Sequence, residues 1–453
     1  MQLISSYAIK LTGDLKALDD SIVIYRKALS FVIPIVNNHW GEMKDFEFNN
    51  QCMVYVEKLI HSTKDNQAVY NFDEEFHKFP SYLRRAVINR AIGIVSSYRS
   101  NLASWEKKLE LDGKDKGNLR SPRLSACHYD YPAYYKGNLF RNFNPETQTI
   151  ELKVFKNTDW VYETYRLKTS DCNYYKKNLA SKRQNIPAIK KKGRRFYAEF
   201  SYKEKVSLID QDDIKKICAI DLGIGTDATC SIMSSDGTVH ARKFIHFSEE
   251  HDRLNTQIGR IKRNQRRGNK RNKKLWKRVS GISQDIADKT ARSIFEFGHE
   301  HEVDVFVVEF LEFKGKQAVE RAHFWRYKRI YAVLGMTAHR HGLRISRVSA
   351  RNTSKLAFDG SGVVKRGSKI SKDTPYSIVQ FTSGKFYNAD LNAAYNVGAR
   401  YWIRHLLKSI PETERLALEA KVPHVAKRST CTLSHLFSLR SELNVLHAKR
   451  TQA

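Results

Sequence analysis

The sequence predicts a multidomain protein of the α+β class. Its 453 residues allow about two to four domains. Apolar residues recur at helical spacing before residue 116 and alternate with polar residues after residue 117. From residue 215 onward, short apolar runs alternate with helical segments, which predicts a mixed α/β domain. Hydrophobic residues make up 41% of the chain and charged residues 28%, a balance typical of a folded chain.

The N-terminal part predicts one strand and two long helices. Residues 3–11 alternate weakly, as in a strand. Residues 18–36 predict a helix, which Pro34 is expected to end or kink because proline has no N–H to donate. Residues 82–105 predict a second helix. The apolar face of the first helix consists of Leu18, Ile22, Tyr25, Leu29 and Val32.

A small β-domain is expected next, over residues 117–205. It follows a linker-like stretch at residues 111–122 that is rich in Gly, Asp and Lys. Three alternating runs predict strands, and we interpret them as part of a barrel with basic loops. The runs cover residues 150–155, 159–167 and 195–202.

The last part predicts a sheet with helices around it. Its predicted strands cover residues 217–221, 228–235, 239–247, 303–311 and 343–349. Its predicted helices cover residues 282–299, 325–341 and 388–401, followed by a basic region with some helical pattern. Residues 350–386 are rich in Gly, Ser and Lys and predict an irregular insertion.

The charge of the chain points to a polyanionic partner. There are 79 Lys and Arg against 48 Asp and Glu, a net charge of +31. Such an excess repels itself unless a polyanion neutralises it, and nucleic acid is the leading candidate. A membrane surface, or a merely solubilising surface, is the alternative. The densest basic block lies at residues 249–279 and predicts a phosphate-binding helix or hairpin.

Several side chains are candidates for contact with nucleic acid. Arginines on the second helix could face nucleic acid or only water, and tyrosines near Lys136 could stack on bases or lie in the β-domain core. The candidates are Arg84, Arg85, Tyr134, Tyr135, Lys136, Lys191, Lys192, Arg263, Arg266, Arg267, Lys270, Arg271 and Lys274.

The cysteines and the N-terminal residues predict a cytoplasmic protein, associated with the nucleoid of a prokaryote. None of the six cysteines forms a Cys-x-x-Cys pair, so we expect reduced thiols. Residues 1–10 do not combine a basic segment with an apolar core, so no signal peptide is predicted. No run of about 18 apolar residues predicts a membrane span.

Three acidic residues stand where apolar elements end or begin. Asp221 ends an apolar run that then turns through Gly223 and Gly225; Glu309 lies near the end of a second apolar run; Asp390 lies in the first turn of a helix. Each has an ordinary alternative: a turn, an exposed strand end, a helix N-cap. Taken together, they predict an RNase H-like fold in which the acids meet at one edge of a sheet.

Such a cluster of carboxylates is typical of a site for two Mg²⁺ ions. Carboxylate oxygens are the hard ligands that Mg²⁺ prefers, and two ions can activate a water and stabilise the leaving oxygen of a phosphodiester. Asp227, Asp304 and Glu312 are weaker candidates.

The motifs around the three acids resemble those of the TnpB proteins of insertion sequences and the related compact type V CRISPR effectors. They read Ala-Ile-Asp221-Leu-Gly-Ile, Val-Val-Glu309-Phe-Leu and Asn-Ala-Asp390-Leu-Asn-Ala-Ala-Tyr-Asn-Val. The third is the most specific. The strong resemblance covers residues 215–401, whereas the N-terminal half resembles the family only in its order of elements.

The resemblance implies an RNA-guided DNA endonuclease with a split RuvC domain. Asp221, Glu309 and Asp390 would be its catalytic residues and magnesium ligands. Guide RNA and target double-stranded DNA would be its partners, with base pairing reading the sequence. The sequence leaves open whether the chain acts as a monomer or as a homodimer.

The resemblance also implies a domain organisation. The recognition domain would be helical and the wedge domain a β-barrel. The expected boundaries are 1–16 for the first wedge strand, 17–116 for the recognition domain, 117–214 for the wedge domain, 215–350 and 387–453 for the two nuclease parts, and 351–386 for the insertion between them.

The insertion departs from the pattern of the family, which usually carries a zinc ribbon of paired cysteines there. Residues 356–386 contain no cysteine. Zinc is therefore not predicted, and we expect turns together with Phe358, Tyr376 and Phe381 to hold the loop.

Two other functions remain open. A guide-bound DNA-binding repressor that does not cut would be expected to lose one of the acids, and all three are present. A transposase acting directly on DNA could have a similar site, since one fold serves several functions.

Overall fold

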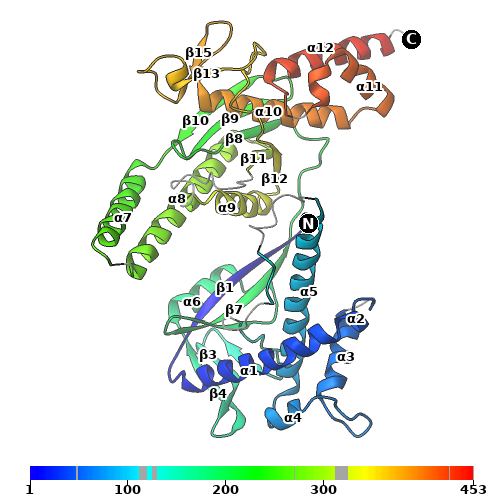
Figure 1. The fold of residues 1–453 in the computed structure, drawn as a ribbon, viewed down its shortest axis with the longest axis vertical. Coiled ribbons are helices and arrows are strands. Elements are labelled where there is room, and N and C mark those ends of the chain that lie inside the picture. Colours follow the sequence, from blue (N-terminus) through cyan, green and yellow to red (C-terminus); the bar gives the residue numbers. More distant parts are fainter. Residues whose placement is uncertain are drawn as a thin grey trace. The chain divides into compact units, whose positions relative to one another are not determined.

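The computed structural model divides the chain into two units, Gln2–Glu204 and Met1 with Lys205–Ala453, called here the N-terminal and C-terminal units (Figure 1). The structure describes residues 1–46, 49–111, 120–124, 130–269, 271–311, 325–427 and 429–451. Both units combine a sheet with helices, so the chain is α+β, as predicted. No helix among these residues is long and apolar enough to cross a bilayer.

The N-terminal unit is built on one seven-stranded sheet. The strands pair in the order β2-β3-β4-β1-β7-β5, and β6 also pairs with β7. The path of paired strands ends at β2 and β5, and isolated bridges from Ala133 to Ala188 in β6 and from Lys136 to Phe140 in β2 link the segment before β2 to both sides of the sheet. The strands are β1 (Gln2–Thr12), β2 (Phe140–Asn144), β3 (Thr149–Lys156), β4 (Asp159–Leu167), β5 (Arg183–Gln184), β6 (Ala188–Lys192) and β7 (Arg195–Lys205).

Helices of the N-terminal unit share one apolar core with this sheet. The five residues predicted to form the apolar face of the first helix are all buried. Pro34 lies inside that helix, so of the two predicted effects it does not end the helix; its neighbours Ile33 and Ile35 are buried. The helices are α1 (Lys16–Asn38), α2 (Trp40–Met43), α3 (Asn49–Ile60), α4 (Phe72–Glu75), α5 (Ser81–Leu111) and α6 (Thr169–Asn178).

The C-terminal unit is built on a five-stranded mixed sheet with the order β10-β9-β8-β11-β12. The first three strands form the predicted antiparallel meander, and β8, β11 and β12 are parallel. The strands are β8 (Lys216–Asp221), β9 (Ala228–Ser234), β10 (Val239–Ile245), β11 (Val305–Phe310) and β12 (Arg344–Ser349).

Helices cover both faces of this sheet. One face packs against α10 and α12 in one apolar cluster, and the other packs against α8 and α9 in a second cluster. The basic block at residues 249–279 forms a hairpin of α7 and the start of α8. Of the two predicted forms, a helix or a hairpin, the structure has the hairpin. The helices are α7 (Ser248–Arg266), α8 (Lys273–Glu300), α9 (Tyr327–Arg340), α10 (Ala389–Lys408), α11 (Glu412–Lys421) and α12 (Leu433–Thr451), with short 3₁₀ turns at Gly367–Lys369 and Pro423–Ala426.

The cysteine-less insertion contains a small three-stranded sheet with its own apolar cluster. Its strands are β13 (Lys365–Arg366), β14 (Ile378–Gln380) and β15 (Phe386–Asn388). Phe358 packs edge-on against Phe381 with ring centres 5.3 Å apart, as expected of two of the three aromatic residues. Tyr376 differs from the prediction because it is 72% exposed.

Candidate metal centre

Two neighbouring strands place Asp221 and Glu309 side by side. In the parallel pair of β8 and β11, Ile220 lies opposite Val308, so each acid follows at the same level. Side chains alternate between the faces of a strand. Since Ala219 and Val307 pack in the cluster that contains α10, both acids lie on the α10 face of the sheet.

The third acid reaches this face from the first turn of α10. Asn388, not Asp390, is the N-cap: its Oδ1 accepts hydrogen bonds from the N–H groups of Asp390 (2.9 Å) and Leu391 (3.0 Å). The Asp390 carboxylate is therefore not used as a cap. It accepts instead from Arg366 Nη2 at 3.5 Å.

A glycine brings α10 close enough to the sheet. A Cβ at Gly398 would lie 2.9 Å from Met233 Sδ and 3.2 Å from Ala219 Cβ, so a side chain there would push the helix off the strands. A second glycine shapes the loop after Asp221, because a Cβ at Gly223 would lie 2.7 Å from the Thr226 carbonyl oxygen. Gly225 has nothing within 4 Å and is not required on this ground.

Burial raises the pKa values of two of the acids, and for one of them the neighbouring carboxylates add to the shift. Removal from water, then the nearby charges of Glu309 and Asp390, hold the pKa of Asp221 well above its usual range, while Arg366 opposes the shift. Burial raises the pKa of Glu309 to about 7, against the opposing effects of Thr353 and Arg400. The metal-free cluster therefore retains protons that isolated carboxylates would lose.

One oxygen of the cluster has no partner in the described part of the chain. Glu309 is 7% exposed, and its Oε1 is buried without a hydrogen bond. An unpaired buried acceptor among carboxylates is costly unless a cation lies beside it. The donor set consists of hard oxygens, so the residues fit Mg²⁺.

Regularly spaced polar residues along α10 attach the surrounding segments to the site. Asn392 accepts from the Phe358 N–H (2.8 Å) and donates to the Leu356 carbonyl oxygen (2.9 Å). Asn396 donates to the carbonyl oxygens of Thr353 (2.9 Å) and Leu356 (2.8 Å). These roles were not predicted. The asparagines recur every four residues from Asn388, and this spacing indicates that they lie on the same face of the helix.

Arg400 continues this spacing and is buried. Its guanidinium donates to carbonyl oxygens at the start of the insertion and in the segment before α12, at 2.6 to 3.1 Å. The acceptors are Ser349, Arg351, Ser429 and Cys431. Arg400 therefore fixes the backbone that leaves β12, beside Glu309.

The insertion contributes a cation that the sequence did not single out. Arg366 on β13 donates from Nε to the Tyr376 carbonyl oxygen at 2.6 Å, and its guanidinium lies 4.1 Å from the centre of the Tyr376 ring. This stacking holds Arg366 toward Asp390. The exposed Tyr376 thus orients an arginine and does not fill a core.

The weaker acid candidates serve other purposes. Asp304 Oδ2 accepts from the N–H groups of Lys215 (2.7 Å) and Lys216 (2.9 Å) and so fixes the start of β8. The paired strands β8 and β11 begin there, whereas Asp221 and Glu309 lie at their other end. Asp227 pairs with two histidines, as described below. Glu312 lies outside the described residues.

Two nucleic-acid candidates in the N-terminal unit are structural in this arrangement. Arg84 is buried and pairs with Glu57 at 3.3 Å and Asp73 at 3.8 Å. Tyr134 is buried and its hydroxyl donates to the Lys153 carbonyl oxygen at 3.1 Å, so the core alternative applies to it. Neither side chain is available to a phosphate or a base.

The remaining candidates of this unit are partly or fully exposed. Arg85 shares Glu57 with Arg84, and Lys191 is bound to Asp19 at 2.6 Å. Tyr135 is half-buried against Tyr82, and Lys136 and Lys192 are exposed.

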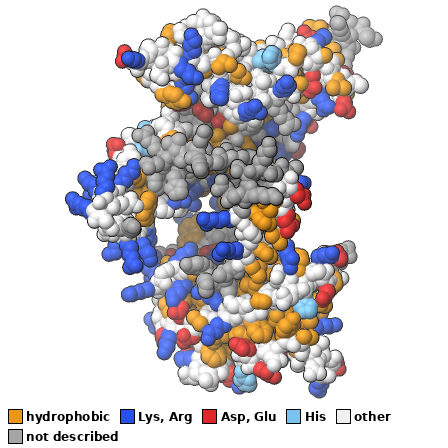
Figure 2. All heavy atoms as spheres, in the orientation of Figure 1, with side chains coloured by type: hydrophobic (Ala, Val, Ile, Leu, Met, Phe, Trp, Pro, Cys, Tyr) orange, Lys and Arg blue, Asp and Glu red, His pale blue; other side chains and the backbone are white. Residues whose placement is uncertain are grey.

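Exposed cations gather on the hairpin of α7 and α8 (Figure 2). Five of the residues predicted there to contact nucleic acid are exposed, and none of the five forms an ion pair with a described residue: Arg263, Arg266, Arg267, Arg271 and Lys274. Lys270 lies outside the described residues. This surface retains the free positive charge that a polyanion requires.

Comparison with known proteins supports the resemblance at the level of the family. A profile of the Aq_aa04 family matches residues 4–156. The TnpB-like protein aq_aa05 of Aquifex aeolicus (strain VF5) is 27% identical over 152 residues, which cover 30% of this chain and 46% of that protein. The resemblance to the TnpB proteins is confirmed. The chain thus matches less than half the length of this relative.

Two further comparisons extend the similarity. The uncharacterized protein aq_aa04 of the same organism is 26% identical over 167 residues, which cover 32% of this chain and 90% of that protein. A solved structure of the mini-RNA-guided endonuclease CRISPR-Cas_phi3 has a TM-score of 0.52 and 10% sequence identity. It covers 88% of this chain and 92% of that one, so the two proteins share a fold.

Proposed function

We propose that this protein is an RNA-guided DNA endonuclease with a RuvC-type site in its C-terminal unit. The observation that carries the proposal is the meeting of Asp221, Glu309 and Asp390 on one face of the sheet, with Glu309 Oε1 buried and unpaired. The repressor alternative does not explain why all three acids are present, since the charges of Glu309 and Asp390 act unfavourably on ionised Asp221 unless a cation is bound.

The three carboxylates would hold two magnesium ions. Bound there, the ions would supply Lewis-acid activation of water and neutralise charge on the phosphodiester. The acids are fixed on two strands and a capped helix, and rigid elements keep donor positions constant. Arg366 would lie beside the DNA phosphate once Asp390 turns to a cation, since only a 3.5 Å contact connects the two side chains.

Guide RNA and target double-stranded DNA would be bound through basic surfaces such as the α7–α8 hairpin. Arginine and lysine at such positions contact phosphates and do not read sequence. Sequence would then be read by base pairing.

The test is guided cleavage by the protein purified with its own RNA. We expect a discrete co-purified RNA, and cutting of double-stranded DNA that matches its variable end only when Mg²⁺ is present. Asp221→Ala should abolish cutting and leave RNA binding intact, whereas Asp373→Ala, an exposed acid of the insertion, should change neither.

Three outcomes would contradict the proposal in different ways. Cutting that survives Asp221→Ala would refute the site. Specific DNA binding without cutting by the wild-type protein would favour the repressor, and joined DNA products without any guide would favour a transposase.

A further inference from the structure

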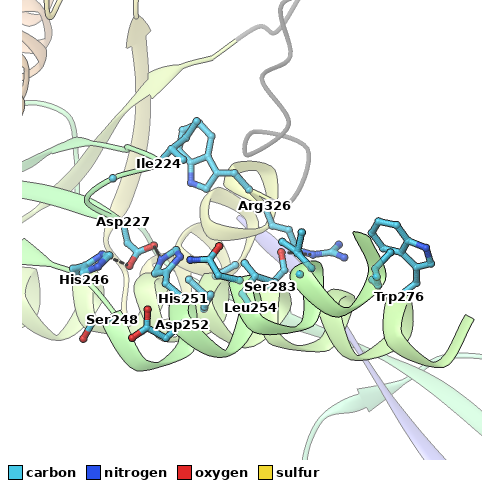
Figure 3. A pocket seen from close by; sticks show the side chains of 18 of the residues that line it. Ile224, Asp227, His246, Ser248, His251, Asp252, Leu254, Trp276, Ser283 and Arg326 are labelled. Carbon is cyan, nitrogen blue, oxygen red and sulfur yellow. Dashed lines mark hydrogen bonds and ion pairs between the residues drawn. The ribbon is translucent and has the colours of Figure 1, made fainter. Parts of the chain in front are cut away.

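A second group of metal-ligating side chains lies beside the loop between β8 and β9. Asp227 ends that loop, His246 follows β10 and His251 lies in the first turns of α7 (Figure 3). Asp227 Oδ1 is 2.8 Å from His251 Nε2, and Asp227 Oδ2 is 3.4 Å from His246 Nδ1. One ligand atom from each of the three residues lies within 4.8 Å of the other two.

The geometry of this group is that of a partly built coordination sphere. Zinc–ligand bonds are about 2.0–2.2 Å long, so ligands of one zinc lie close together, and a small approach of the imidazoles is sufficient here. The Phe247 N–H donates to Asp227 Oδ2 at 3.0 Å and orients the carboxylate. Such partners of a ligand are typical of metal sites.

The fourth side of the group faces a cavity of about 940 Å³ between α7, α8 and the start of α9. Asp227, His246 and His251 lie at one end of this cavity, and Trp276 and Arg326 lie at the other (Figure 3). His246 and His251 retain 43% and 25% exposure of their side chains, so an ion has a path to them.

We propose that Asp227, His246 and His251 bind a divalent transition metal of the zinc class, with an open coordination position facing the cavity. Two imidazoles and one carboxylate are typical zinc ligands, and three protein ligands leave one position for water or another ligand. Imidazole selects zinc, cobalt or nickel over magnesium, so this site and the three-carboxylate cluster would take different ions.

This site modifies the expectation that the protein binds no zinc. The absence of paired cysteines speaks only against a ribbon in residues 356–386. Cysteine spacing carries no information on ligands that the fold brings together from a loop, a strand end and a helix.

The experiment is zinc titration of the full chain, purified with its RNA and stripped with EDTA. Calorimetry with ZnCl₂ and elemental analysis after dialysis should find about one ion per chain. His246→Ala and His251→Ala should each weaken binding by more than about tenfold, because even partners outside the ligand shell cost 10- to 100-fold. His240→Ala, an exposed histidine on β10, should bind zinc as wild type.

A further variant separates the two sites. Asp221→Ala should keep its zinc, and loss of zinc in Asp221→Ala with retention in both histidine variants would overturn the proposal. So would wild-type protein that binds no zinc, or zinc binding that survives both histidine substitutions. His246 is exposed, so His246→Ala is expected to fold, and its melting temperature tests this. If His251→Ala fails to fold, His246→Ala still tests the proposal.

Discussion

Two aspartates bracket the loop between β8 and β9 and have opposite surroundings. Asp221 faces two other acids, and its pKa is raised by removal from water and by their charges. Asp227 is buried, yet it accepts from the Phe247 N–H and contacts two histidines, and its hydrogen bond raises the pKa of His251. The charge of Asp221 is placed next to other acids, whereas the charge of Asp227 is balanced by a hydrogen bond and two histidines of the chain itself.

The difference shows why burial alone does not identify an ion site. Asp227 is more buried than Asp221, but the protein supplies its hydrogen-bond partners. Around Glu309 the described residues leave one oxygen unsatisfied. We therefore expect the three-carboxylate cluster to require a hard cation for activity, and the Asp–His group to hold together without an ion.

The largest expected effect is on cleavage. Glu309→Gln keeps the shape of the side chain and removes its charge, so guided cleavage should fall by more than about 100-fold, since partners outside a ligand shell already cost up to that factor. Asp227→Asn should leave cleavage within a few-fold of wild type. Equal losses in the two variants, measured as single-turnover rates, would mean that the two sites act as one.

The second effect is on stability as a function of pH. The pKa of Glu309 is raised from 4.5 to about 7, so the folded state holds this proton more tightly than the unfolded state does. The resulting stability is present below about pH 4.5 and is lost as pH rises through about 7. Metal-free Glu309→Gln should therefore be more stable than wild type at pH 8, by on the order of 1–3 kcal/mol.

Thermal unfolding at pH 5 and pH 8 in EDTA measures this difference. Glu300→Gln, an exposed glutamate at the end of α8, is the matched control and should change little. Added Mg²⁺ should stabilise wild type and not Glu309→Gln, because a bound ion stabilises the state that binds it. A wild type no less stable than Glu309→Gln at pH 8 would contradict the assigned cost of burying the charged Glu309 carboxylate.

The third effect separates the sites by geometry. Gly398→Ala should cost about 1–3 kcal/mol because its Cβ would overlap Met233 and Ala219. The shift of α10 should also reduce cleavage and leave the Asp–His group unchanged. Gly259→Ala, in open space on α7, should stabilise by roughly 0.5–1 kcal/mol, and chemical denaturation compares the two variants.

The smallest effect concerns the hairpin that follows the Asp–His group. Replacing Arg266 and Arg267 together by glutamine should weaken RNA binding and lower the slope of affinity against salt by about one for each phosphate that is no longer neutralised. The control replaces Arg292 and Lys372, which are exposed elsewhere in the C-terminal unit. If both double variants weakened RNA binding equally, the RNA would be held by the overall positive charge and not by the hairpin surface.

Much of the C-terminal unit could be predicted because its local patterns agree with its packing. The run that ends at Asp221 and the run that carries Glu309 form parallel neighbours, and Asp390 begins the predicted helix. Pro34 was harder to place, since burial of Ile33 and Ile35 outweighs the loss of one helical hydrogen bond.

Side-chain partners across long separations could not be predicted. Arg84 reads as a surface cation, but Glu57 and Asp73 neutralise it inside the N-terminal unit. Arg366 and Asp390 meet only because β13 and α10 are brought together. The same holds for His246 and His251, whose significance depends on Asp227 at the end of another loop.

The polar stripe on α10 has a consequence for how freely the insertion can diverge. Among the described residues, the hydrogen bonds of Asn392, Asn396 and Arg400 all go to main-chain atoms of the segments around them. Every amino acid offers the same carbonyl oxygen, so substitutions in those segments need not break the attachment. A helix that recognises main-chain groups tolerates the exchange of a zinc-binding sequence for one without cysteines, provided that the path of the chain is kept.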